Sequence, residues 1–131
     1  MSFSLEVKMW CQQAAEGLNE ARAAALLDIG TSIINDTPVK TGLAKGNWQS
    51  SVNEPKTERL SIRPASDAIA ELVAVLAQLK DDETFIMRNN LPYATPLEFG
   101  HSQQAPAGMV RANVKRWNAA VERAALHVRD T

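Results

Sequence analysis

The first third of the chain has apolar residues at helical spacing. Four of them, separated by four, three and four positions, are Phe3, Val7, Trp10 and Ala14. This spacing places them on one face of an α-helix. The pattern therefore predicts one long helix over residues 4–35 with a buried face. Gly30 lowers helix propensity by about 1 kcal/mol relative to alanine and marks a place where this helix can end or bend.

The pattern changes at Asn35–Gly42, where the sequence reads NDTPVKTG. Pro38 has no amide hydrogen and disfavours helical geometry in the residue before it. Gly42 tolerates a positive φ. Alternate side chains then share a face at Trp48, Ser50 and Val52. The segment therefore predicts a turn followed by a strand within residues 43–53.

The middle of the chain contains a polar connection and a second helix. Residues 54–64 are polar and flanked by prolines, which indicates an exposed connection with a short strand at residues 60–63. Apolar residues at i, i+3, i+4 and i+7 then predict a helix over residues 66–79, capped by Ser66 or Asp67. Lys80 lies near its negative end, and the acidic run at 81–83 predicts a turn.

The last part of the chain predicts a second strand and a third helix. Residues 84–89 are rich in strand formers, and residues 107–129 have an apolar stripe at helical spacing. The stripe consists of Val110, Val114, Trp117, Val121, Ala124 or Ala125, and Val128. We therefore expect an α+β fold in a single domain over residues 1–131. A small antiparallel sheet packs against the long N-terminal and C-terminal helices, with an additional middle helix.

Composition narrows the range of functions. The chain has 131 residues, of which 45% are hydrophobic and 22% charged, with net charge −1. Proteins that grip a nucleic-acid duplex over many phosphates carry a basic excess, which this chain lacks. The start lacks the pattern of a secretory signal, and the longest weakly polar run, residues 68–79, is too short to span a membrane. Cys11 is the single cysteine, so no disulfide within the chain is expected.

The loop from Leu91 to Arg111 concentrates the residues with candidate chemistry. It contains Glu98 and His101, three positions apart. A metal site needs several ligands at suitable spacing, and His127 is far away in the sequence. Nucleophilic catalysis needs a nucleophile, a base and an orienting group, and a glycosidase needs two facing carboxylates. None of these sets is complete, so the sequence predicts no catalytic centre, no metal and no cofactor.

A basic stripe on the last predicted helix gives a second functional hypothesis. The residues are Arg111, Lys115, Arg116 and Arg123. Such a stripe is typical either of a solvated helix face or of a surface that contacts nucleic acid. The alternative to a purely structural role is therefore a nucleic-acid-binding module that uses this helix.

Two segments resemble a known family. Residues 37–52, TPVKTGLAKGNWQSSV, are similar to the T-P-V-x-T-G-x-L-x-x-S/N-W segment of small structural proteins in tailed bacteriophages and prophages. Residues 89–111 are similar to the second segment of that family. They contain a tyrosine–alanine pair, an LEFG turn and QAPAGMVR, which opens the last helix. The two segments occur in the expected order. The family comprises neck, tail-completion and minor tail proteins of long-tailed phages, and the middle helix makes this chain longer than its most compact members.

The resemblance implies a structural virion protein without catalysis, assembled in the bacterial host cytoplasm. Such proteins form rings, often sixfold, between the head connector and the tail tube or tail terminator. The resemblance also allows a chain that is a monomer in isolation and forms the ring only at assembly. Contact with DNA is not indicated, and a membrane is not involved.

The resemblance also nominates residues that shape the two loops or contact neighbours. The loop-shaping candidates are Pro38, Gly42, Trp48, Pro92, Tyr93, Glu98, Phe99, Gly100 and Pro106. The contact candidates are His101, Gln103 and Gln104, and Glu98 can pair with Lys40 or Arg111. An enzyme that uses Glu98 and His101 remains a third hypothesis.

Overall fold

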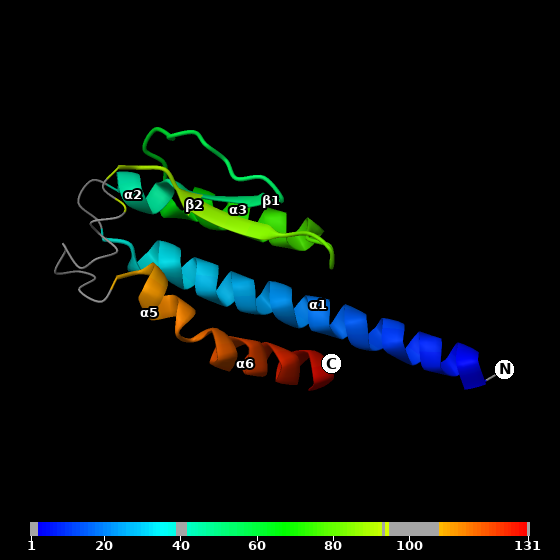
Figure 1. Cartoon of the computed structure of the whole chain (residues 1–131). Helices are drawn as coiled ribbons and strands as arrows, with labels where there is room; N and C mark the ends of the chain where they lie inside the picture. The colour runs from blue at the N-terminus through cyan, green and yellow to red at the C-terminus, as the bar shows by residue number, and fades with distance from the viewer. Residues whose placement is uncertain (1–2, 39–41, 93, 95–107, 131) are drawn as a thin grey trace.

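A computed structural model describes the backbone of residues 3–38, 42–92, 94 and 108–130, and the side chains in these ranges between Glu20 and Leu126. The elements in chain order are α1 (Phe3–Asp36), α2 (Leu43–Gly46), β1 (Trp48–Val52), α3 (Ala65–Gln78), β2 (Phe85–Asn89), α5 (Val110–Val114) and α6 (Trp117–Asp130) (Figure 1). These helices and strands confirm the predicted α+β class.

The described strands form one antiparallel pair. Trp48 lies opposite Asn89, and Val52 lies opposite Phe85. The predicted strand at residues 84–89 is confirmed, but the prediction of a strand over residues 43–53 is correct only from Trp48 onward. Residues 43–46 form the short helix α2 instead. The predicted strand at residues 60–63 is wrong, since these residues have neither helical nor strand structure.

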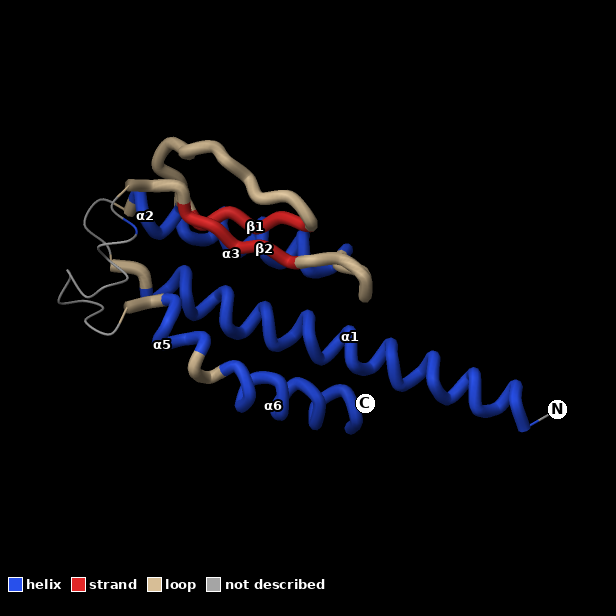
Figure 2. The backbone as a smooth tube through the Cα atoms, viewed as in Figure 1, coloured by secondary structure: helices blue, strands red, loops and turns tan. Residues whose placement is uncertain are grey.

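The elements are arranged around α1 (Figures 1 and 2). The middle helix α3 packs along β1, and α1 packs against α3 on one side and α6 on the other. The sheet is therefore covered mainly by α3, whereas the C-terminal helix α6 packs on α1. This arrangement refines the predicted packing of both terminal helices against the sheet.

The long first helix is confirmed, and it does not end or bend at Gly30. The helix continues to Asp36. A Cβ atom on Gly30 would lie 2.8 Å from a methyl carbon of Leu72, which is fully buried on α3. The glycine therefore permits close packing of α1 against α3 rather than a helix end.

The middle helix is also confirmed, but not its predicted cap. Its buried positions are Ala68, Leu72 and Leu76, at the i, i+4 spacing of a single face. The N-cap position is Pro64, and no side chain caps the helix there. The predictions for Ser66 and Asp67 as caps are therefore wrong. The turn predicted at 81–83 is present, with the Glu83 amide donating to the Lys80 carbonyl oxygen.

The predicted C-terminal helix is interrupted. It consists of α5 and α6, separated by Lys115 and Arg116. The prediction that Val114 belongs to the buried stripe is wrong, because it is 52% exposed. Asn113 is buried in its place, and its amide donates to the Met109 carbonyl oxygen at 2.6 Å and to the Asp36 carboxylate at 2.9 Å. A buried polar side chain at the α1–α5 contact thus replaces an expected apolar one.

Candidate functional site

The exposed connection between β1 and α3 is fixed by polar side chains. Asn47 is fully buried, and its amide nitrogen donates to the carbonyl oxygens of Leu43 at 2.8 Å and Leu60 at 3.1 Å. Its side-chain oxygen accepts from the Leu60 amide at 2.8 Å. Gln49 donates to the Glu58 carbonyl oxygen at 2.7 Å. These bonds replace a strand ladder, which explains why residues 60–63 lie beside the sheet without joining it.

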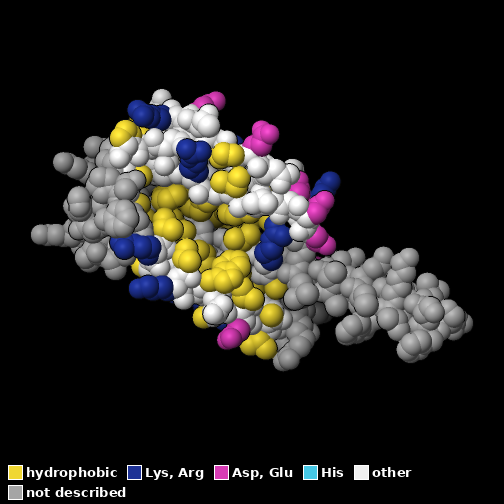
Figure 3. Space-filling model, viewed as in Figure 1, with side chains coloured by type: hydrophobic (Ala, Val, Ile, Leu, Met, Phe, Trp, Pro, Cys, Tyr) yellow, Lys and Arg dark blue, Asp and Glu magenta, His cyan; other side chains and the backbone are white. Residues whose placement is uncertain are grey.

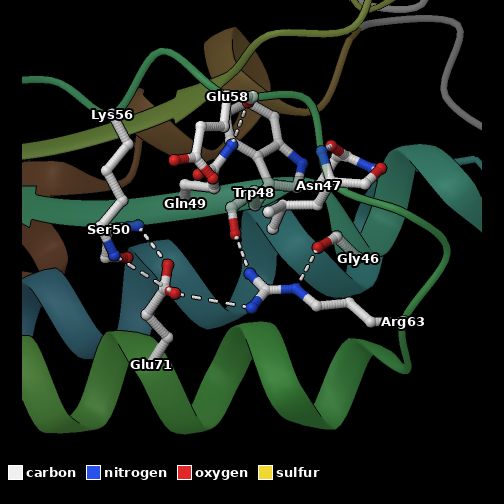
Figure 4. Close-up of polar contacts among 10 residues, drawn as sticks. Gly46, Asn47, Trp48, Gln49, Ser50, Lys56, Glu58, Arg63 and Glu71 are labelled. Carbon is white, nitrogen blue, oxygen red and sulfur yellow. Dashed lines mark hydrogen bonds and ion pairs between the residues drawn. The ribbon is translucent and has the colours of Figure 1, made fainter.

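Arg63 and Glu71 connect the same loop to β1 and α3 (Figure 4). The Arg63 guanidinium donates to the carbonyl oxygens of Gly46 at 2.6 Å and Trp48 at 3.0 Å. It also lies 3.5 Å from the Glu71 carboxylate. That carboxylate accepts from the Ser50 amide at 2.8 Å. We call Asn47, Gln49, Arg63 and Glu71 the polar network.

The polar network sets the ionisation of Glu71. Partial burial alone would raise the pKa of this carboxyl group. The hydrogen bond from the Ser50 amide and the charges of Lys56 and Arg63 outweigh burial, so the pKa lies below its ordinary value of 4.5. Glu71 is therefore ionised at neutral pH. It is suited to hold β1 and the loop together rather than to donate a proton.

The first loop segment is a structural junction between α1 and β1. The Thr37 hydroxyl donates to the Ile33 carbonyl oxygen at 2.7 Å, and the Trp48 indole nitrogen donates to the Thr37 hydroxyl at 2.8 Å. Pro38 is buried, and Gly42 has φ +81°, which favours glycine. The threonine, proline, glycine and tryptophan of this segment therefore shape the path of the chain.

The chemistry available to the polar network is limited because its groups already have partners. Among the described residues, every buried side-chain nitrogen or oxygen makes a hydrogen bond. The same part of the chain contains no group of three or more His, Cys, Asp or Glu residues arranged to hold a metal ion. The polar network therefore has the features of an architectural element.

An apolar hollow lies on the face shown in Figure 3. It is bordered by β2, α1, α5 and α6, as comparison with the same view in Figure 1 shows. The half-buried apolar side chains that these elements contribute to the edge of the core are Leu26, Phe85, Met87, Val110, Trp117 and Val121. We refer to this surface, between β2, α1, α5 and α6, as the apolar hollow. Large contiguous apolar patches are typical of protein–protein contacts, which makes this surface a candidate for one.

The wall of the hollow formed by β2 has an open strand edge. The Ser50 amide and the Trp48 carbonyl group bind Glu71 and Arg63, so they point away from β2. Opposed residues of an antiparallel pair share this orientation, so the main chain of Met87, opposite Ser50, points away from β1. The amide and carbonyl groups of Met87 therefore lie on the outer side of β2.

The basic stripe is divided by contacts within the chain. Arg116 lies 3.7 Å and Arg123 3.3 Å from the Asp28 carboxylate on α1. Arg111 and Lys115 are exposed on the other part of the stripe. Arg116, just before α6, and Arg123, within α6, therefore connect this part of the chain to α1, which reduces the charge that they offer to phosphate groups.

The structure describes part of the predicted site. It connects Trp48 to the end of α1 through Thr37, places Pro38 buried just after α1 and Gly42 just before α2, and places Pro92 in an exposed turn and Arg111 on the surface of α5. Lys40 and most second-loop candidates lie outside the described residues: Tyr93, Glu98, Phe99, Gly100, His101, Gln103, Gln104 and Pro106. Their predicted roles stay predictions.

The sequence did not single out the polar network or the hollow. Asn47 precedes Trp48 in the first of the two segments that resemble the phage family. That position is the one feature of the sequence that points to Asn47. Arg63 and Glu71 are eight residues apart on different elements, and no spacing rule pairs them. The hollow combines residues from four elements, so only the packing of the chain reveals it.

None of the described helices is both long and apolar enough to cross a bilayer. Comparisons with protein-family models, with curated proteins and with solved structures each found no match to this chain.

Proposed function

We propose that this chain is a structural virion protein of a tailed bacteriophage that completes the tail or joins head to tail by assembling as a ring. The resemblance of its two loop segments to neck and tail-completion proteins supports this function. Its expected partners are further copies of itself, the head connector, and the tail tube or tail terminator.

The observation that carries the proposal is the apolar hollow. Apolar side chains gather on one face of the molecule, between β2, α1, α5 and α6 (Figure 3). The half-buried residues Leu26, Met87 and Val121, from three of these elements, pack at the edge of the core. A surface of this kind is stabilised when another protein covers it. The polar network, by contrast, keeps the adjacent loop in a single shape. Together they supply a rigid subunit with a contact face, which is what ring assembly requires.

The test is deletion of the coding region from the phage or prophage that carries it, followed by electron microscopy of the lysate. We expect filled heads and separate tails, with joining restored by the wild-type chain supplied from a plasmid. Normal, fully joined particles in the deletion strain would show that the proposal is wrong.

A matched pair of variants links this function to the hollow. Val121→Asp places a charge at a half-buried position of α6, a helix that borders the hollow, whereas Leu126→Asp places the same charge at a position of the same helix that is 49% exposed. We expect Leu126→Asp to restore particle joining and Val121→Asp to fail, provided that circular dichroism shows both chains folded. If the two variants restore particle joining equally well, the hollow is not required for the function.

A further inference from the structure

The N-terminal part of α1 extends past the rest of the fold. The helix α6 runs antiparallel to α1, since Asn113 binds Asp36 and Arg123 binds Asp28. The end of α6 is seven residues beyond Arg123, about 10 Å, which is level with roughly residue 21 of α1. Arg22 binds the carbonyl oxygens of Asp81 and Glu83 in the turn before β2. Both layers therefore end near this level, and the preceding helix projects from them (Figure 1).

We call residues 3–20 the arm. At 1.5 Å per residue it is about 27 Å long. Its sequence carries the Phe3, Val7, Trp10 and Ala14 face, whose spacing predicts burial. The ribbon shows no other element alongside the projecting part of the helix (Figures 1 and 2). The sequence pattern, together with the projecting backbone, therefore predicts that this face meets a surface of another molecule.

The apolar hollow matches the arm in apolar character and in length. An amphipathic helix binds a groove through residues at i, i+3, i+4 and i+7, and the arm has this spacing. The wall formed by α6 is 14 residues long, or about 21 Å, which is close to the length of the arm. The opposite wall, β2, is a five-residue strand carrying Arg88, a short and charged edge that disfavours pairing with a further strand.

The charges of the two surfaces are complementary. The arm has Glu6, Glu16 and Glu20 against Lys8, a net charge of 1 − 3 = −2. Residues 110–116, which border the hollow, contain no acidic residue, and their Lys115 is exposed, whereas Arg116 is paired with Asp28. Attraction between these surfaces favours docking of the arm and sets its orientation.

We propose that the arm of one copy docks in the apolar hollow of the next copy. The arm and the hollow are different surfaces of one chain, so the contact is heterologous and repeats around a closed ring. The inference rests on the proposed ring assembly and identifies the interface that builds it. A chain cannot fill its own hollow this way, because the straight helix α1 carries the arm away from it.

Cross-linking tests the inference with the native cysteine of the arm. Val121→Cys or Met87→Cys adds one thiol at a half-buried position of α6 or β2, which border the hollow, and Leu126→Cys is the control at an exposed position of α6. Within one chain, Cys11 is about 17 residues along α1 from the level of Asp28, or about 25 Å, which is too far for a direct link. A short bis-maleimide should therefore link hollow-cysteine chains into oligomers on a denaturing gel, with only background linking for Leu126→Cys.

A second variant examines the arm itself. Trp10→Ser should shift the full-length chain from oligomer to monomer in light scattering and remove the cross-links, while the melting temperature of the monomer stays the same. An oligomer that persists in Trp10→Ser without hollow cross-links overturns the inference and leaves the ring function in place. A chain that is monomeric and unlinked at every concentration also overturns it, and the deletion experiment then decides the function independently.

Discussion

Replacing Asn47 with alanine should destabilise the fold strongly, although the sequence did not nominate Asn47 as a functional residue. The side chain is fully buried and makes three hydrogen bonds, two to Leu60 and one to Leu43. Each bond contributes about 1 kcal/mol net, and an unsatisfied group left behind costs about 1–3 kcal/mol. Partial access of water to the exposed loop lowers the total, so we expect a loss of about 2–4 kcal/mol in the free energy of unfolding.

The assay is urea denaturation followed by circular dichroism, with the melting temperature as a second readout. A loss of this size corresponds to a fall of roughly 10 °C in the melting temperature for a domain of this length. Asn90→Ala is the matched control, because Asn90 donates to the carbonyl oxygens of Lys56 and Glu58 at 2.9 Å in an exposed position. Its loss should be at most about 1 kcal/mol.

Asn47→Asp sharpens the same prediction. The aspartate keeps an oxygen that accepts from the Leu60 amide, but it replaces the donor that faces the carbonyl oxygens of Leu43 and Leu60. We expect this variant to be less stable than Asn47→Ala, because a carboxylate then faces two acceptors in a buried site. If Asn47→Ala is no less stable than Asn90→Ala, or if Asn47→Asp matches the wild type, the reasoning about this loop is refuted.

Three further predictions concern the same region. The lowered pKa of Glu71 contributes stability that is present above about pH 4.5 and is lost as the pH falls through the folded-state pKa. Glu71→Gln should therefore have a lower urea midpoint than the wild type at pH 7, and the two midpoints should be closer at pH 3. Equal pH profiles of the two proteins would contradict this. Gly46→Ala would bring its Cβ into collision with the Arg63 carbonyl oxygen, and we expect a loss of about 1–3 kcal/mol by urea denaturation, against no loss if the loop moves freely. Thr37→Val removes the acceptor of the Trp48 indole and should cost about 1–3 kcal/mol and shift the tryptophan fluorescence; an unchanged spectrum and midpoint would disprove this role of the bond.

The helices that follow a single periodic signal were predictable from the sequence. The helix α3 was expected from the spacing of Ile69, Leu72, Val73, Leu76 and Leu79. Leu72, Leu76 and Leu79 are buried as that pattern predicts, whereas Val73 is 47% exposed and Ala68 is buried instead. Burial of one apolar face depends only on that local pattern, so periodicity is sufficient. Gly30 was misinterpreted because its low helix propensity is local information, whereas its packing against Leu72 is tertiary.

The elements that depend on polar contacts were not predictable. The connection at residues 60–63 has a plausible strand composition, but Asn47 and Arg63 bind main-chain groups that a ladder would otherwise use. The apolar stripe predicted across α5 was wrong for the same reason, because Asn113 is buried and its amide donates to Asp36, 77 residues away in the sequence. A polar residue is buried when its partners are in place, and those partners come from distant parts of the sequence.

The first of the two segments that resemble the phage family is therefore a better predictor of the fold than of the function. In the first, Thr37, Gly42 and Trp48 are explained by the junction between α1 and β1: a hydrogen-bonded hydroxyl and indole, and a positive φ. Any protein with this junction would select these residues, whatever it binds. Their resemblance to the phage family thus indicates a shared architecture more directly than a shared partner. In the proposed assembly, the partner is chosen by the apolar hollow and the arm, which lie outside the first segment. A change of partner can therefore occur at Trp10 or Val121 without any change in the motif by which the fold is recognised.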